Sequence, residues 1–262
     1  HEDECNAPEF FSGAKLTLVG NGDKINPKEL KKSIQAEESR GVHGPQRGPV
    51  SITQITEKGQ VYTLNEINEL TQIAKEFKLP VHMDGARFAN ALVSLGCTAA
   101  EMTWKAGVDV VSFGGTKNGL MGVEGVIFFD PQKAWEFELR RKRAAHLFSK
   151  HRYLSAQMLA YLQNDLWIEL AGKANKAASR LIAGLREIEK VEFLVEPKAN
   201  LIFVKMPAYM HRKAFAMGLE YYTWSEIDGV SDDTPVVARF VVDWSRSLGD
   251  IDKFLEIMKN AA

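Results

Sequence analysis

The sequence predicts an α/β fold, in which a mainly parallel sheet carries helices on both faces and a smaller α+β lobe follows it. Two observations predict this fold. Helical and strand-like segments alternate up to Asp130, and beyond Pro131 long helical segments lead to short strands with helices between them. Alternation of this kind is typical of a parallel sheet covered by helices. We expect a large domain over residues 1–150, and connecting helices with a small domain over residues 151–262.

The first half contains an amphipathic helix that we expect from Leu64 to Lys78. Its apolar residues recur at helical spacing, and Thr63 with Glu66 three residues on forms a capping box at its start. The elements expected next are a strand at 79–83, a helix at 97–106, and strands at 108–113 and 124–129.

The second half is predicted to begin with long helices that join the two lobes, and to end with an amphipathic helix. That last helix follows Ser247, which has Asp250 three residues on as its capping partner. The elements expected before it are helices at 132–148 and 153–188, strands at 191–195 and 201–205, a helix at 211–217, and strands at 219–224 and 236–242.

Composition narrows the classes of partner. The 262 residues are 45% hydrophobic, and 33 basic against 34 acidic residues leave a formal net charge of -1, so no global field favours nucleic acid or an anionic membrane. Cys5 and Cys97 lie far apart and outside any metal-ligand spacing, which fits a reducing cytoplasm. No apolar run is long enough to span a bilayer. We therefore expect a cytoplasmic protein that acts on a small molecule, with no metal ion, nucleic acid or membrane.

A lysine follows one of the apolar strands. Val110–Phe113 is apolar, Gly114 and Gly115 break the run, and Lys117 comes two residues later. A lysine delivered by a strand end into a glycine-lined pocket can lose its water, which lowers its pKa toward that of the neutral amine that attacks carbonyls. The pattern predicts a Schiff-base lysine, and an ordinary solvated loop lysine is the alternative.

A carboxylate ends the neighbouring strand. Asp84 lies at that strand end beside Gly85, where a ligand can approach closely. Such a carboxylate can hold a protonated heteroaromatic nitrogen, and an aspartate with a lysine is the pair that pyridoxal phosphate requires. The alternative for Asp84 is a turn or capping residue. His82, on the same strand face, either orients the carboxylate or is a satisfied core histidine.

Four stretches carry a family resemblance. They are residues 3–11 (DECNAPEFF), 51–54 (SITQ), 82–88 (HMDGARF) and 112–119 (SFGGTKNG). They resemble low-specificity threonine aldolases, within the β-eliminating lyase group of fold-type-I pyridoxal-phosphate enzymes. The resemblance implies cleavage of β-hydroxy-α-amino acids, of the threonine or phenylserine type, to glycine and an aldehyde. The alternatives are β-elimination from an amino acid, and a non-catalytic pyridoxal-phosphate fold that serves as a binding protein.

The resemblance also implies roles for single residues. Lys117 would form the internal aldimine, and Asp84 would pair with the pyridine nitrogen of the cofactor. Arg87 would lie near the phenolic oxygen of the cofactor and the substrate, and Thr116 is expected among the cofactor contacts. Arg239 matches the small-domain arginine that binds the substrate carboxylate, a task that suits a planar guanidinium. For Arg239, an edge-strand arginine that faces water is the alternative.

The resemblance also bears on the oligomeric state, through Arg152. It matches an arginine that reaches the phosphate site across a subunit boundary in related enzymes, which implies a homodimer or homotetramer with shared active sites. Apart from the resemblance, the basic runs at 140–143 and 150–152 lack interleaved aromatic residues, so they predict a solvated helix face and not a nucleic-acid site.

Two departures from the family affect the expected site. Relatives carry an earlier Ser-Gly-Thr loop that holds the cofactor phosphate at a helix N-terminus, and this chain starts after it, so we expect residues 1–150 to be an N-terminally incomplete cofactor-binding domain. The ring-stacking histidine of the family falls at or near His1. Where many relatives place a histidine near the substrate hydroxyl, the nearest match is Gln54. A glutamine cannot act as a general base at neutral pH, which leaves a water or another side chain as the proton acceptor.

Overall fold

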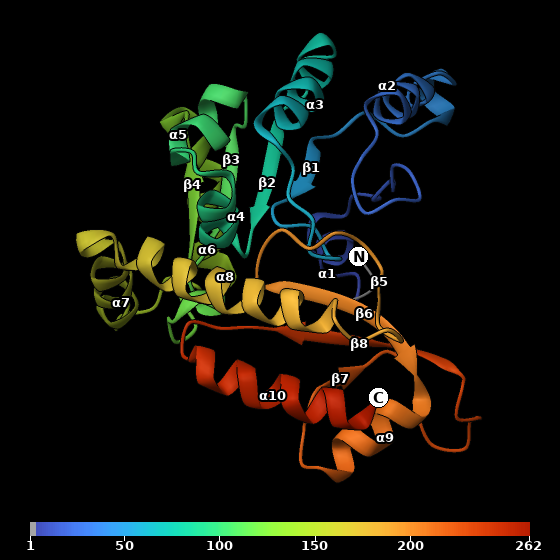
Figure 1. Ribbon diagram of the computed structural model, residues 1–262. Coiled ribbons are helices and arrows are strands. Elements are labelled where there is room, and N and C mark those ends of the chain that lie inside the picture. The colour runs from blue at the N-terminus through green and yellow to red at the C-terminus, as the bar shows by residue number, and fades with distance from the viewer. Residues whose placement is uncertain (1–3) are drawn as a thin grey trace.

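The computed structural model describes residues 4–262, which form two sheets with helices around them (Figure 1). The helices are α1 (Ala7–Ser12), α2 (Pro27–Ala36), α3 (Leu64–Glu76), α4 (Phe88–Leu95), α5 (Ala99–Met102), α6 (Ala134–Arg143), α7 (Arg152–Leu162), α8 (Leu166–Leu185), α9 (Ala208–Ala216) and α10 (Leu248–Ala261). The strands are β1 (Val50–Thr53), β2 (Val81–Gly85), β3 (Val110–Gly114), β4 (Glu124–Phe128), β5 (Glu192–Phe193), β6 (Leu201–Pro207), β7 (Tyr222–Thr223) and β8 (Pro235–Val241).

The first sheet has the strand order β1-β2-β3-β4. β1, β2 and β3 are parallel, and β4 pairs antiparallel with β3, so the predicted mainly parallel sheet is confirmed. The register aligns Asp84 of β2 with Thr53 of β1 and Ser112 of β3. In Figure 1 the carboxyl ends of β1 and β2 point toward the second sheet. Residues at these strand ends therefore lie between the two lobes.

The two faces of the first sheet differ in polarity. One face carries buried apolar side chains that form a core with α3, α4 and α5; in the strands these are Val50, Ile52, Val81, Met83, Val111 and Phe113. The opposite face carries Ser51, His82 and Ser112, because side chains along a strand alternate between faces. At the β4 edge this face contacts α6, where the rings of Phe128 and Phe137 lie 5.3 Å apart.

The second sheet is antiparallel, with the strand order β5-β6-β8-β7. On one face, Leu201 and Phe203 of β6 and Val237 of β8 pack with the core of the first sheet. On the other, side chains of β6 and β8 form a second core with α8, α9 and α10. Arg239, two residues after Val237, shares the face that lies toward the first sheet.

Helix α8 packs against both cores. Trp167 and Leu170, near its start, pack with the first core, and Ala177 and Leu181 belong to the second. Figure 1 shows this helix running between the first sheet and α10. The first core also includes Tyr161 and parts of β6, so the domain boundary expected at residue 150 remains a prediction.

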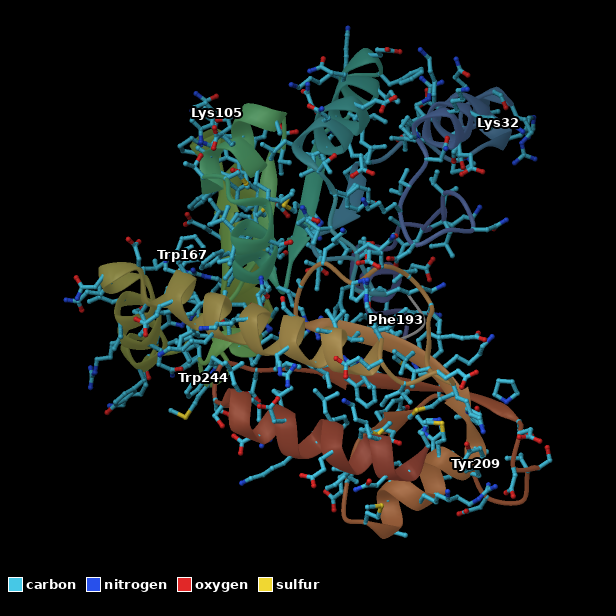
Figure 2. The ribbon with its side chains drawn as sticks, in the orientation of Figure 1. Lys32, Lys105, Trp167, Phe193, Tyr209 and Trp244 are labelled. Atoms are coloured by element: carbon cyan, nitrogen blue, oxygen red, sulfur yellow. The ribbon has the colours of Figure 1, made fainter. Side chains whose placement is uncertain are left out.

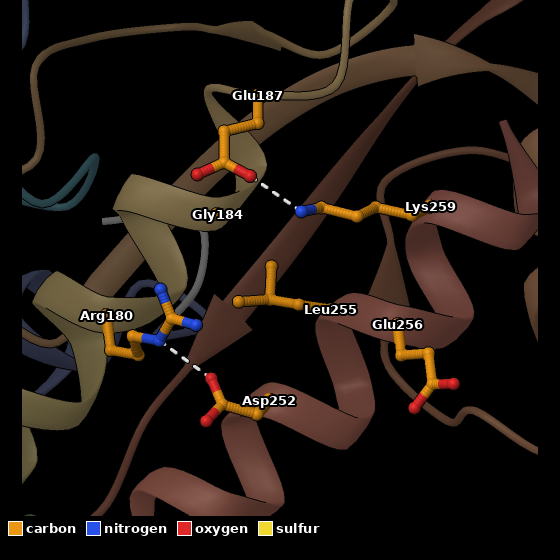
Figure 3. A pocket seen from close by; sticks show the side chains of 7 residues that line it. All are labelled: Arg180, Gly184, Glu187, Asp252, Leu255, Glu256 and Lys259. Atoms are coloured by element: carbon orange, nitrogen blue, oxygen red, sulfur yellow. Dashed lines mark hydrogen bonds and ion pairs between the residues drawn. The ribbon is translucent and has the colours of Figure 1, made fainter.

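Helices α8 and α10 approach closely at Gly184. A Cβ at this position would lie 2.3 Å from Leu255 Cδ1, so Leu255 would have to shift to make room for any other residue. Figure 3 shows Leu255 facing Gly184. Two ion pairs flank this contact, Arg180 with Asp252 at 2.7 Å and Glu187 with Lys259 at 2.6 Å. The cavity of about 260 Å³ at this crossing is therefore lined largely by charges that are already paired.

Several predicted helices differ in extent from the observed ones. The helix expected at 153–188 breaks into α7 and α8, because Asn164 and Asp165 adopt left-handed backbone angles with φ of 53° and 56°. The helix expected at 132–148 ends at Arg143, shortly before Ala145 with φ of 62°. The helix expected at 97–106 forms as α5 and a separate 3-10 turn. The helices α1, α2 and α4 and the strand β1 were not predicted.

The predicted strands and helix caps agree more closely with the structure than the predicted helix bounds do. Strands form within or across all the expected segments, although β5 and β7 have only two residues each. Both predicted capping boxes are present, at Thr63 with Glu66 and at Ser247 with Asp250.

Candidate functional site

Asp84 ends β2 with one carboxylate oxygen fixed and one available. Its Oδ1 accepts the Ala86 N–H at 2.9 Å, and its main-chain oxygen accepts the Gln54 N–H at 2.8 Å. Within residues 4–262, Oδ2 has no hydrogen-bond partner, and the side chain is half-buried. Asp84 can therefore accept a hydrogen bond from a ligand while its backbone and its other oxygen stay in place.

The turn that carries Lys117 is clamped from the side of β4. The two oxygens of Glu124 each accept a backbone N–H, from Gly115 and from Thr116, both at 3.1 Å. Charge-assisted bonds to a carboxylate are stronger than neutral ones. Sequence reasoning missed Glu124, because its partners are backbone groups that only the strand pairing brings close.

The other side of this turn is held by Asn118. Its Nδ2 donates to the Tyr161 hydroxyl at 2.6 Å and to the Trp167 carbonyl at 2.9 Å. Burial raises the pKa of Tyr161 to about 12, so the hydroxyl stays neutral and can both accept from Asn118 and donate to the Gly114 carbonyl.

The next residue in the chain, Gly119, lies against Trp244: a Cβ on Gly119 would lie 3.2 Å from Trp244 Nε1. Figure 2 shows Trp167 and Trp244 near the start of α8.

Lys117 itself is exposed, which differs from the expected desolvated pocket. The glycines before it serve packing and do not enclose its amine. A Cβ on Gly115 would lie 2.6 Å from Leu120 Cδ1, and Gly114 lies against the backbone of Ala86. The glycines thus bring the Lys117 turn close to the Asp84 turn.

Two arginines come together between the lobes. Arg87 follows Asp84 and is half-buried, and its Nε is shielded from solvent without a hydrogen-bond partner among the described residues. Burial lowers the pKa of Arg87, and the positive charge of Arg239 lowers it further, whereas Glu57 and Asp84 raise it. Arg239 approaches from β8 and is also half-buried. Two neighbouring guanidinium groups favour an anionic ligand such as a carboxylate.

His82 is hydrogen-bonded on both sides across the first sheet. Its Nδ1 lies 2.8 Å from Ser51 Oγ, and its Nε2 lies 2.9 Å from Ser112 Oγ. Burial lowers the pKa of His82, and the nearby charge of Asp84 only partly offsets this effect. Since both ring nitrogens are engaged by serines, His82 does not bond the Asp84 carboxylate and is a satisfied histidine.

Gln54 does not lie where a substrate contact was expected. The residue is fully buried, its Nε2 donates to the Tyr62 carbonyl, and its Oε1 accepts the Tyr62 N–H, both at 2.9 Å. The side chain therefore fixes the loop after β1. Glu57, three residues on, lines a cavity of about 270 Å³ that begins at β1, and sequence reasoning missed it.

The remaining expected residues lie at the margin of the site or outside it. Thr116 is exposed, and its hydroxyl lies 3.5 Å from the Val123 carbonyl. Arg152 begins α7, is exposed, and lies 5.5 Å from the ring of Tyr153. Among the residues described, it forms neither a hydrogen bond nor an ion pair with Asp84. His1 falls outside the described part of the chain.

Comparison with known proteins identifies the family. The family model described as β-eliminating lyase matches residues 1–208. The chain belongs to the β-eliminating lyase family. This family membership confirms the resemblance found in the sequence.

Two curated proteins are similar over most of this chain. A low specificity L-threonine aldolase of Pseudomonas sp. (strain NCIMB 10558) is 40% identical over 244 residues, which cover 92% of this chain and 68% of that protein. The low specificity L-threonine aldolase of Pseudomonas aeruginosa is 37% identical over 260 residues, which cover 98% of this chain and 71% of that protein.

Solved structures agree on the fold. A Leishmania major threonine aldolase superposes with a TM-score of 0.85 at 24% identity, over 97% of this chain and 72% of that one. A putative L-allo-threonine aldolase of Listeria monocytogenes superposes with a TM-score of 0.73 at 15% identity, over 99% of this chain and 71% of that one. At these identities the likeness concerns the fold, and it confirms the predicted fold class.

Proposed function

We propose that this β-eliminating lyase family member uses pyridoxal phosphate to cleave β-hydroxy-α-amino acids of the threonine or phenylserine type to glycine and an aldehyde. One observation carries the proposal: the turns of Asp84 and Lys117 touch at the carboxyl ends of neighbouring parallel strands. Ligands of such sheets bind at this edge. The two Pseudomonas relatives named low specificity L-threonine aldolase support the reaction class.

The residues present fit the cofactor. Oδ2 of Asp84 and Nε of Arg87, which have no hydrogen-bond partner within residues 4–262, suit a protonated ring nitrogen and an oxygen of cofactor or substrate, respectively. The exposed Lys117 is accessible to an aldehyde, and Thr116 precedes it. When bound, pyridoxal phosphate supplies an electron sink for the carbon–carbon cleavage.

Arg239 binds the substrate in this proposal. Its position on the face of the second sheet that lies toward the first lets it reach a carboxylate beside Arg87. We assign residues 1–150 to the cofactor and residues 151–262 to the connecting helices and this substrate contact. Gln54, enclosed by Tyr62, has no part in substrate binding here.

We also propose that the protein forms a homodimer or homotetramer with shared active sites. Helix α7 begins with Arg152 and presents exposed apolar side chains, among them Tyr153 at 63% and Leu159 at 71% exposure. Exposed apolar groups that lie together are typical of interfaces. Light scattering tests the proposal, and a stable monomer that turns over substrate would exclude it.

The proposed location is the cytoplasm, because Cys5 and Cys97 are both free thiols. Within the described residues, no helix has both the length and the apolar character needed to cross a membrane.

The products test the reaction most clearly. With cofactor and threonine or phenylserine, we expect aldehyde and glycine in equal amounts. Keto acid and ammonia would assign the protein to β-elimination. Binding of cofactor with no product from a panel of hydroxy amino acids would leave only a binding role.

A further inference from the structure

The turn after β1 is held in place by both lobes. Asp23 accepts the Thr56 hydroxyl with one carboxylate oxygen, and with the other it accepts the Lys58 N–H at 3.0 Å. Gly59, with φ of 90°, lies against the second sheet: a Cβ there would lie 2.2 Å from the Leu201 carbonyl oxygen. These anchors hold the backbone of the turn on both sides of residue 57.

The side chain between these anchors is that of Glu57. It is exposed, and among residues 4–262 it makes no hydrogen bond and no ion pair, although its neighbours Thr56 and Lys58 are both held by Asp23. A carboxylate without a partner on a rigid turn is available to a ligand.

Glu57 also lies close to the residues of the site. It lines the cavity of about 270 Å³ together with Ser51 and Thr53, which come from the polar face of the first sheet. Thr53 is aligned with Asp84 in the parallel pair of β1 and β2. The cavity therefore adjoins the strand end where Asp84 and Arg87 lie, and the charge of Glu57 acts on the Arg87 guanidinium.

The other candidates for a base at this edge are engaged. The amide nitrogen and the amide oxygen of Gln54 are both bonded to Tyr62, and both ring nitrogens of His82 are bonded to serines. Asp84 is assigned to the cofactor nitrogen. In this part of the described chain, Glu57 is the carboxylate that remains available to act as a base.

We propose that Glu57 accepts the β-hydroxyl proton of the amino acid substrate, a role that rests on the proposed function. In this step the O–H bond breaks, its proton moves to a Glu57 carboxylate oxygen, and its electron pair becomes the second C–O bond of the aldehyde. The Cα–Cβ bond breaks at the same time, and its electron pair stays with Cα, which later takes up a proton to give glycine.

Two reactions of the cofactor-loaded full-length protein separate this role from the rest of the site. Cleavage of threonine requires the hydroxyl proton to leave, whereas exchange of the glycine Cα proton with D2O does not. Glu57→Gln keeps the shape of the side chain and removes its basicity. We expect cleavage to fall by about 100-fold or more, with the exchange rate and the glycine affinity close to those of the parent. Glu57→Asp should recover part of the cleavage, and Glu69→Gln, at an exposed position of α3, is the control.

Two results would overturn the role of Glu57. One is cleavage by Glu57→Gln at the rate of the parent and of Glu69→Gln. The other is an equal fall of cleavage and exchange, which would make Glu57 a residue that shapes the site as a whole. A parent protein that exchanges the glycine proton but cleaves no β-hydroxy amino acid would instead overturn the proposed function, and the role of Glu57 with it.

Discussion

Gly114 packs directly against the backbone of Ala86. A Cβ added to Gly114 would lie 2.3 Å from the Ala86 carbonyl oxygen and 2.6 Å from its carbonyl carbon. The Ala86 N–H bonds the Asp84 carboxylate, and Gly114 leads into the turn of Lys117. This contact therefore sets the spacing between the carboxylate and the lysine, and only glycine permits it.

Gly114→Ala should separate the two turns. Overpacking of this kind costs about 1 to 3 kcal/mol of the free energy of unfolding, and the loss of spacing should weaken cofactor binding as well. Gly48→Ala is the control, because a Cβ there meets no atom within 4 Å. Absorbance titration with pyridoxal phosphate and chemical denaturation measure both effects. A Gly114→Ala protein that matches the control in both would show that the contact does not set the spacing.

Arg239→Ala should weaken amino acid binding and spare the cofactor. Removal of one partner of a desolvated charge pair costs about 2 to 5 kcal/mol of binding free energy. Arg239→Lys keeps the charge but loses the bidentate geometry, so it should recover only part of the affinity. Titration of glycine and of pyridoxal phosphate into each variant distinguishes the two ligands. Release of the cofactor by Arg239→Ala, or unchanged glycine affinity, would make Arg87 the better candidate for the carboxylate.

His82 should make stability depend on pH. Burial lowers its pKa below the ordinary value of 6.5, so the unfolded chain binds the proton more tightly than the folded one. The stabilisation is therefore complete above pH 6.5 and is lost as the pH falls below that value. The free energy of unfolding, measured with urea, should differ less between about pH 7.5 and about pH 5.5 for His82→Gln than for the parent. Burial also lowers the pKa of His211, but this residue is present in both proteins, so it contributes equally to their pH dependence. An unchanged difference would mean that His82 does not titrate differently on folding.

Two glycines of α8 should respond in opposite directions to alanine. Gly184→Ala brings a Cβ to 2.3 Å from Leu255 Cδ1 and should destabilise the protein, by about 1 to 3 kcal/mol. Gly172→Ala meets no atom within 4 Å. Its higher helix propensity should stabilise by about 0.5 to 1 kcal/mol. Equilibrium unfolding measures both, and a stabilised Gly184→Ala protein would contradict the packing at this crossing (Figure 3).

Local sequence patterns predicted the features that depend on neighbours in the chain. Asp84 and Lys117 were located at strand ends because each follows an apolar run, and Thr63 with Glu66 was identified by spacing alone. The break at Asn164 and Asp165 was not predicted, because the apolar side chains on either side of it, such as Leu162 and Leu166, keep a helical spacing.

Features that depend on contacts across the fold were not accessible in this way. The bonds of Glu124 to Gly115 and Thr116 require the antiparallel pairing of β4 with β3. The burial of Gln54 depends on its bonds to Tyr62, eight residues away on a returning loop. For the same reason, the exposure of Lys117 could not be read from the glycines that precede it.

The identity of the lysine that holds the cofactor tests the proposed function most directly. The full-length protein is mixed with pyridoxal phosphate, reduced with borohydride, digested and mapped by mass spectrometry. We predict one stable adduct at Lys117, which is absent from Lys117→Ala while that variant remains folded. An adduct at another lysine, or no adduct in a folded parent protein, would contradict this prediction.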